Sequence, residues 1–197
     1  MREISPAVNL SAEEFLNLLL PEARQHVDRI RAQKRAGSRP KPSTSLIDES
    51  NLLDSKRRRL LLDKVAAFVD ESLGGRSDMC IQFADLLERA LVHLGIEARS
   101  VIGQARYFHN GEEVFRWRHA WVETENEIID GNIDSVSENP AIPSLKRNPY
   151  WGSTVEVPND REFQEDVSMD FPKEKDVAEI WWPEMKEWLN EKFQQTS

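Results

Sequence analysis

The feature that most constrains the fold is a run of alternating residues between positions 98 and 130, which contains two turn signals. Asn110-Gly111 is a strong signal for a two-residue hairpin turn, and Glu125-Asn126 marks a second turn further along the chain. The flanking segments repeat with a period of two, which is typical of strands: 98–108, 113–124 and 127–130. The sequence therefore predicts an antiparallel meander.

Segments with helical periodicity lie on both sides of this meander. Apolar residues recur every three or four positions in four places: 11–35, 51–73, 77–95 and 177–193. Helices of this kind bury one side against another layer. We therefore predict an α+β protein in which a helix packs on an antiparallel sheet, with added N- and C-terminal helices.

A short segment without apolar periodicity, GSRPKPSTS at Gly37–Ser45, follows the first helical pattern. Its proline, serine and glycine content predicts a flexible or extended connector. The predicted organisation is an N-terminal helix and flexible connector at 1–45, a core at 46–160 and a C-terminal helical extension at 161–197.

Composition argues against several classes of function. The chain of 197 residues has no apolar run near the roughly 20 residues that span a bilayer, and its N-terminal residues lack the apolar centre of a secretory signal. The single cysteine, Cys80, excludes an internal disulfide and fits a reducing compartment, so a cytoplasmic location is expected.

The net charge of -9 disfavours nucleic acid and anionic membranes, and mildly favours basic or neutral polypeptide substrates. No glycine-rich phosphate loop is present, and we expect no cofactor and no metal.

Cys80 lies near the expected start of a helix. If Ser77 or Asp78 caps that helix, Cys80 falls in the first turn, where free amide hydrogens and the helix dipole stabilise a thiolate. This position favours a nucleophilic cysteine. Cys80 also shares a helical face with apolar residues, so a small core residue is the alternative interpretation.

His119 lies in the second predicted strand between two tryptophans that project to the same face, Trp117 and Trp121. An aromatic wall of this kind excludes water and holds an imidazole in place, which suits a general base. A core histidine packed on tryptophans would give the same pattern.

The second turn provides a candidate partner for this histidine. A two-residue turn at Glu125-Asn126 pairs Trp121 with Asp130 and His119 with Asn132, so that Asp130 lies diagonal to His119 on one face. Either Asp130 or Asn132 could accept the imidazole hydrogen and orient the ring. Both remain candidates, with Asn132 as the alternative orienting residue.

These residues also carry a family resemblance. Cys80-Ile-Gln-Phe-Ala-Asp-Leu-Leu, Leu94-Gly-Ile-Glu-Ala-Arg, His119-Ala-Trp-Val-Glu and Ile128-Ile-Asp130 resemble the motifs of the transglutaminase-like superfamily of cysteine hydrolases. The resemblance covers about residues 75 to 135. It implies a papain-like core and a catalytic triad of Cys80, His119 and Asp130.

The implied activity is acyl transfer on an amide bond of a peptide or protein, by a protease, deamidase or transglutaminase type of thiol enzyme. The superfamily also includes members that have lost catalysis, so a silent protein-binding or regulatory module, which could use the terminal helices to engage a partner, is the alternative. Candidate residues of the substrate cleft are Ser77, Trp117, Trp121 and Trp151. Trp151 lies in a proline-bounded loop, where aromatic residues more often pin the loop onto the core, and that packing role is the favoured alternative for it. One oxyanion donor is expected to be the backbone amide of Cys80.

Overall fold

The computed structural model describes residues 21–70, 75–139 and 146–193. The chain divides into two compact units, Met1–Arg39 and Pro40–Ser197. In the first unit, helix α2 (Pro21–Arg35) ends where the sequence predicts, and Gly37 follows with φ 62°. The predicted cap at Ser11 lies outside the described residues. The boundary after Arg39 precedes the predicted one at residue 45.

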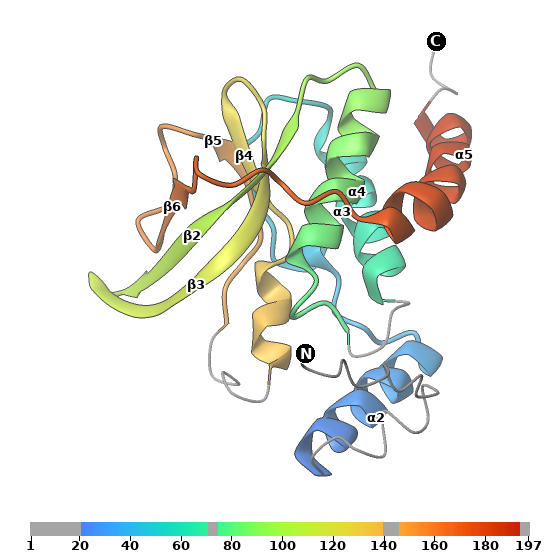
Figure 1. Cartoon of the computed structure of the whole chain (residues 1–197), viewed down its shortest axis with the longest axis horizontal. Helices are drawn as coiled ribbons and strands as arrows, with labels where there is room; N and C mark the ends of the chain where they lie inside the picture. Colours follow the sequence, from blue (N-terminus) through green and yellow to red (C-terminus); the bar gives the residue numbers. More distant parts are fainter. Residues whose placement is uncertain (1–20, 71–74, 140–145, 194–197) are drawn as a thin grey trace, which may run out of the picture. The chain divides into compact units, whose positions relative to one another are not determined.

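The second unit contains a six-stranded sheet (Figure 1). Its strands are β1 (Ile47–Asp48), β2 (Arg99–His109), β3 (Glu112–Glu123), β4 (Glu127–Asp130), β5 (Tyr150–Ser153) and β6 (Arg161–Glu165). They are arranged in the order β1-β5-β4-β3-β2-β6, and only β1 and β5 run parallel. The sheet is therefore mixed, and the α+β class is confirmed.

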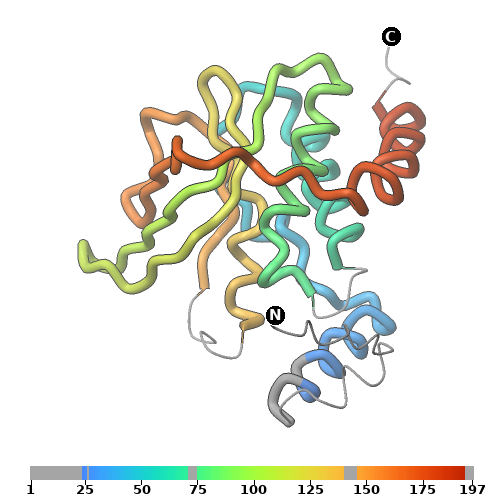
Figure 2. Tube along the Cα trace, in the orientation of Figure 1, coloured from blue at the N-terminus to red at the C-terminus, as the bar shows by residue number. Residues whose placement is uncertain are grey.

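The longer helices of this unit lie on one side of the sheet (Figures 1 and 2). The longer ones are α3 (Ser55–Asp70), α4 (Cys80–His93) and α5 (Trp182–Phe193), and α5 continues from the π-helical turn η3 (Val177–Trp181). Two 3-10 helices, η1 (Pro42–Thr44) and η2 (Ile133–Glu138), complete the described helical elements. Helix α5 is joined to α4 by a hydrogen bond between His93 Nε2 and Asn190 Oδ1 at 2.8 Å.

Turn chemistry sets the register of the central strands. Asn110 and Gly111 both have positive φ, 53° and 83°, which matches the twist of a tight hairpin and pairs β2 with β3 as predicted, and a β-bulge between Tyr107 and Phe108 then shifts the pairing by one residue. At the second turn Val122 pairs with Ile129 and the amide of Thr124 donates to the carbonyl of Glu127 at 2.9 Å. The predicted register of β3 on β4 is therefore confirmed.

The main core lies between the sheet and the helices. Ala120, Val122 and Ile129 contribute the sheet side, and the apolar stripes of α3, α4 and α5 contribute the other. Burial of these stripes stabilises the folded state by about 25 cal/mol for each Å² of apolar surface removed from water. The opposite face of the sheet carries a separate cluster around Trp121 and Tyr150.

The chain's organisation differs from the predicted one in two details. The predicted C-terminal helical extension begins instead with a strand, since β6 pairs with β2 from Tyr107–Arg161 to Gly103–Glu165. The predicted flexible connector is held in its second half, where the hydroxyl of Ser43 donates to Asp63 Oδ2 of α3 at 2.7 Å and Pro42 is buried. In both cases tertiary contacts override a weak local signal.

Residues 166–176, here called the crossing segment, link β6 to the C-terminal helices. The amide of Asp166 donates to the carbonyl of Ile102 at 3.0 Å, and Lys173 forms an ion pair with Glu88 of α4 at 2.6 Å. In Figure 1 this segment runs in front of the central strands and α4 to reach α5. It therefore runs from the edge of β2 to the middle of α4 before α5 begins.

Candidate active site

Cys80 is the first residue of α4. The residue before the helix is Met79, with φ -114° and ψ 32°, and no side chain caps the helix start. The predicted caps Ser77 and Asp78 are therefore wrong by one or two residues, because the chain makes a turn from Arg76 to Met79 before the helix begins. Amide groups in the first turn have no partner within the helix and are available to an anion.

The thiol of Cys80 is partly buried at the edge of the main core. Burial, the largest single effect, favours the neutral thiol, but a hydrogen bond and positive charge from His119 and the backbone of Ala120 outweigh it and lower the pKa of Cys80. On β3, strand β4 pairs with Val122 and Glu123 and does not reach Ala120, so the edge of β3 at Ala120 is open to the thiol. Cys80 is thus poised to ionise.

His119 and Asp130 form a hydrogen-bonded pair in which Nε2 of the imidazole lies 2.9 Å from Oδ1 of the carboxylate. Both side chains are fully buried. The second carboxylate oxygen, Oδ2, accepts a hydrogen bond from the hydroxyl of Tyr107 at 3.1 Å. The ring of Trp117 stacks on His119 with centroids 4.8 Å apart and an interplanar angle of 18°. These contacts hold the imidazole in a single orientation.

The buried charges perturb one another. Burial alone would lower the pKa of His119, but the charge and hydrogen bond of Asp130, followed by the contact with Cys80, raise that pKa above its usual value of 6.5. Burial would raise the pKa of Asp130, but His119, Arg161 and Tyr107 together lower it. The favoured state is therefore an imidazolium between a carboxylate and a thiolate.

The other imidazole nitrogen, Nδ1, is buried and makes no regular hydrogen bond to a described residue. Nε2 is hydrogen-bonded to Asp130. The interaction with Cys80, which also raises the pKa of His119, is therefore assigned to Nδ1. Long or poorly aligned contacts of this kind are common in sites without substrate and tighten when one binds. The imidazole thus lies between its orienting carboxylate and the thiol.

Asn132 does not contact His119. Strand β4 ends at Asp130, and Gly131 passes so close to α3 and α4 that a Cβ there would lie 2.7 Å from Phe83 and 2.8 Å from Leu62. The side-chain amide of Asn132 donates to the carbonyl of Arg76 at 2.9 Å instead. The predicted pairing of Asn132 with His119 is wrong because the strand stops before that residue, and Asp130 is the partner.

Arg76 anchors the turn before Cys80, and sequence reasoning missed this role. Its guanidinium is fully buried, donates to both oxygens of Asp134 at 2.9 Å and lies 3.3 Å from Asp70. Its backbone amide donates to Glu138 at 3.3 Å. With these donors engaged, Arg76 is a structural anchor and is not available to a substrate oxyanion.

The candidate cleft residues have different environments. Ser77 is buried beside Arg76, and Trp117 is partly exposed over His119. Trp121 is buried against Phe163 with centroids 5.2 Å apart. Trp151 is wrong as a cleft residue, because it is fully buried in the main core and donates to Glu127 at 2.9 Å. Trp117 is the candidate that combines exposure with contact to the site.

Tyr107 is a further site residue that sequence reasoning did not identify. Tyr107 pairs with Phe115 across the hairpin, and Phe115 shares its face with His119. The sequence carried no signal for this placement, because the Asn110-Gly111 turn alone would pair Tyr107 with Val114 on the other face, and a β-bulge between Tyr107 and Phe108 brings Tyr107 to the face of the histidine. Its pKa is raised well above 10.0, mainly by burial and by the charge of Asp130, so the hydroxyl stays protonated and donates.

Among the described residues, no three His, Cys, Asp or Glu side chains are placed to hold a metal ion. In the same part of the chain, no helix has the length and apolar character needed to cross a membrane. A scan against protein-family models and searches of curated proteins and of solved structures found no match to this chain.

Proposed function

We propose that this chain is a cysteine-dependent acyl-transfer enzyme that acts on an amide bond of a peptide or protein. The observation that carries the proposal is the buried pair of His119 Nε2 and Asp130 Oδ1 at 2.9 Å, in which the same histidine also interacts with a cysteine at a helix start. A structural histidine does not need a buried carboxylate, a lowered thiol pKa and an open helix terminus together.

In the proposed reaction, the Cys80 thiolate attacks the carbonyl carbon of the amide and forms a carbon–sulfur bond. His119, protonated at the start, gives its proton to the leaving amine as the carbon–nitrogen bond breaks. Water or a second amine then attacks the thioester, gives a proton to His119 and releases the thiolate. Asp130 keeps the imidazole oriented and stabilises its charge throughout.

The negative charge that develops on the carbonyl oxygen needs hydrogen-bond donors. The backbone amide of Cys80 is the first candidate, because it lies at the start of α4 where no side chain caps the helix. We assign no second donor. Removal of one such donor typically slows acyl transfer by about 100-fold or more.

The same proposal includes a transglutaminase-like, papain-like core. A helix that begins with the cysteine, a strand with the histidine and the next strand with the aspartate occur here in that order, in α4, β3 and β4. The motifs around Cys80, His119 and Asp130 resemble that superfamily. Peptides and proteins are the substrates that this assignment favours.

The rate at which Cys80 reacts with iodoacetamide tests the proposal without a known substrate. At about pH 6 an ordinary thiol with a pKa near 8.5 is almost wholly protonated and reacts slowly. We expect Cys80 to react at least about tenfold faster than a free thiol at that pH. His119→Ala should abolish the excess, whereas His109→Ala, which removes an exposed histidine at the end of β2, should not.

If Cys80 is unreactive at this pH, the proposal of an enzyme is overturned, and a binding module becomes the better explanation. The reaction type is then tested by mass spectrometry of cell lysate treated with the intact protein or with Cys80→Ala. New peptide termini would indicate hydrolysis of the backbone, loss of side-chain ammonia would indicate deamidation, and new isopeptide bonds would indicate transamidation.

A further inference from the structure

The face of the sheet that α4 covers continues beyond the start of that helix. Residues paired across β2 and β3 point to the same face, so Ile102 with Ala120, and Gln104 with Arg118, form successive rungs of one ladder. The first rung is buried under the helix, and the second is exposed. A polar platform therefore begins where the helical cover ends.

The direction of α4 places Cys80 at the border of this platform. Glu88, in the third turn of the helix, accepts a hydrogen bond from the amide of Ser100 at 2.7 Å, while Cys80 interacts with the backbone of Ala120. Arg118 follows Ala120 on the same face of β3, two residues or roughly 7 Å along the strand. The arginine side chain is long enough to reach a group bound at Cys80.

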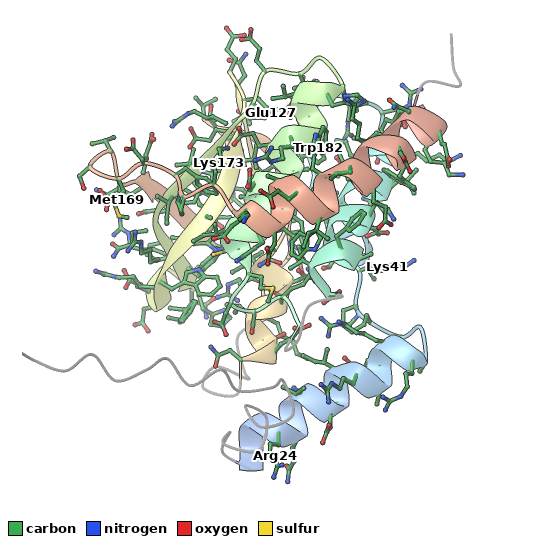
Figure 3. The ribbon with its side chains drawn as sticks, turned by 45° about the vertical axis from the view of Figure 1, so that its right-hand side comes forward. Arg24, Lys41, Glu127, Met169, Lys173 and Trp182 are labelled. Carbon is green, nitrogen blue, oxygen red and sulfur yellow. The ribbon has the colours of Figure 1, made fainter. Side chains whose placement is uncertain are left out.

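Three arginines project from this platform, and they differ in their partners. Arg106 forms an ion pair with Glu162, and Arg116 donates to both oxygens of Glu113 at 2.7 and 2.8 Å. Among the described residues, no carboxylate lies within ion-pair distance of Arg118, whose guanidinium contacts Met169 of the crossing segment instead. Figure 3 labels Met169 on the loop that follows β6. Arg118 is thus exposed and carries a charge that no described carboxylate neutralises directly.

A hollow of about 360 Å³ lies beside Arg118, lined by Gly103, Gln104, Arg118, Gln164, Glu165 and Asp166. Its two acidic residues are engaged elsewhere. Glu165 accepts from Arg99 at 2.8 Å, and Asp166 accepts from the hydroxyl of Ser168 at 2.6 Å. The positive charge of Arg118 also lowers the pKa of Asp166, although the contacts with Ser168 dominate. The groups left to a ligand are a guanidinium and two side-chain amides.

We propose that Arg118 forms a substrate subsite for a carboxylate located close to the reacting amide. Guanidinium binds carboxylate through two parallel hydrogen bonds, and Gln104 and Gln164 are placed to hold the adjacent backbone. The inference rests on the proposed function, because it names the substrate class of the same thiol. It reverses the expectation from the net charge of -9, which favours basic or neutral polypeptides. Charges close to the nucleophile determine substrate selectivity more than the net charge does, because salt screens the more distant charges.

Two alkylating reagents of similar size test this subsite. Iodoacetate carries the carboxylate and iodoacetamide is its neutral analogue, so the ratio of their rates with Cys80 measures the local charge. In a buffer of low ionic strength, Arg118→Gln should lower the iodoacetate-to-iodoacetamide ratio by about two- to fivefold, as expected for the loss of one solvent-exposed charge near the thiol. Arg118→Lys should retain most of the ratio, and Arg116→Gln, one rung further away, is the matched control and should leave it unchanged.

The failure of this inference is distinguishable from failure of the proposed function. If Cys80 of the unaltered protein reacts no faster than a free thiol, the proposed enzyme function is wrong. If Cys80 reacts fast but Arg118→Gln leaves the ratio unchanged, or Arg116→Gln lowers it equally, the subsite alone is overturned. Because each ratio is measured within one variant, a partial loss of fold affects both rates and cancels.

The carboxylate could come from an acidic side chain or from a free C-terminus, and two peptides separate these sources. Acetyl-Glu-Ala-amide carries only a side-chain carboxylate, and acetyl-Ala-Ala with a free terminus carries only the terminal one. Protection of Cys80 from iodoacetamide by one peptide, lost in Arg118→Gln, identifies the source. Equal protection of wild type and Arg118→Gln by both peptides would contradict the proposed subsite.

Discussion

The hydroxyl of Tyr107 donates to Oδ2 of Asp130, the carboxylate oxygen that His119 does not use, at 3.1 Å. Asp130 therefore has a partner on each oxygen, although it is buried on the last residue of a short strand. A buried carboxylate with one oxygen unpaired would be costly and free to rotate. Tyr107 is in this sense a positioning residue for the imidazole.

Tyr107→Phe should weaken this arrangement without a change of packing volume. Loss of a hydrogen bond to a carboxylate costs about 1.5–3 kcal/mol of unfolding free energy. The pKa of Asp130 should also rise, since Tyr107 is one of the groups that lower it, so acid unfolding should begin at a higher pH. Urea unfolding measured across the acidic range checks both effects. The hydroxyl of Tyr150 donates to the carbonyl of Ser153 instead, so Tyr150→Phe is the control and should not change the pH at which acid unfolding begins.

The pH dependence of Cys80 alkylation should follow the coupled charges. The pKa of the thiol is lowered and the pKa of His119 is raised, so the thiolate–imidazolium pair persists at pH values where an ordinary thiol is neutral. The rate with iodoacetamide should stay high as the pH falls through neutrality and drop only when the thiolate is protonated. Measured rates in His119→Ala should instead decline with the titration of a normal thiol. A wild-type profile identical to that of His119→Ala would contradict the coupled pair.

Asp130→Asn should destabilise the fold in a pH-dependent way. The raised pKa of His119 contributes stability that is present below its unfolded value near 6.5 and is lost as the pH rises through the folded value. The lowered pKa of Asp130 contributes stability present above 3.8 and lost as the pH falls through the folded value. Between these limits the substitution should cost about 3 kcal/mol or more, and the cost should shrink in alkaline buffer. Chemical denaturation at several pH values measures this difference.

Arg76→Met should be among the most damaging substitutions outside the site itself. It leaves Asp134 and Asp70 without their shared cation, and breaking a buried ion pair in this way costs about 3–5 kcal/mol. Arg76→Lys should not restore stability, because a single ammonium cannot donate to both oxygens of Asp134. Urea unfolding provides the measurement, and Arg116→Gln, which breaks an exposed pair, should leave stability nearly unchanged. Full stability of Arg76→Met would contradict the anchoring role.

The strands, and the register of β3 on β4, were predictable because local rules govern them, whereas the β-bulge between Tyr107 and Phe108 that shifts β2 on β3 was not. Asn110-Gly111 adopts the positive φ angles that a tight hairpin needs, and the even spacing across Glu125-Asn126 placed Asp130 beside His119. The choice between Asp130 and Asn132 was not predictable. It depends on where β4 stops, which is decided by the close approach of Gly131 to Phe83 and Leu62.

Other features could not be predicted from the sequence, because contacts between distant parts of the chain determine them. Strand β6 is short and carries a weak alternating pattern, and it is recruited by pairing with β2 across a long separation in the chain. Trp151 reads as a loop aromatic beside Pro149, yet a hydrogen bond to Glu127 and the core bury it in β5. The helix cap was displaced because the turn anchored by Arg76 extends to Met79.

The two members of the buried charge pair lie on a single hairpin, eleven residues apart in sequence, whereas the thiol arrives from a separate helix. The hairpin is built from local contacts, which form early and quickly in folding, and docking of α4 depends on contacts between distant parts of the chain. A partly folded chain would therefore hold its cysteine as an ordinary, sluggish thiol. Activation of Cys80 therefore requires that α4 be docked on the hairpin, and it is lost when α4 detaches.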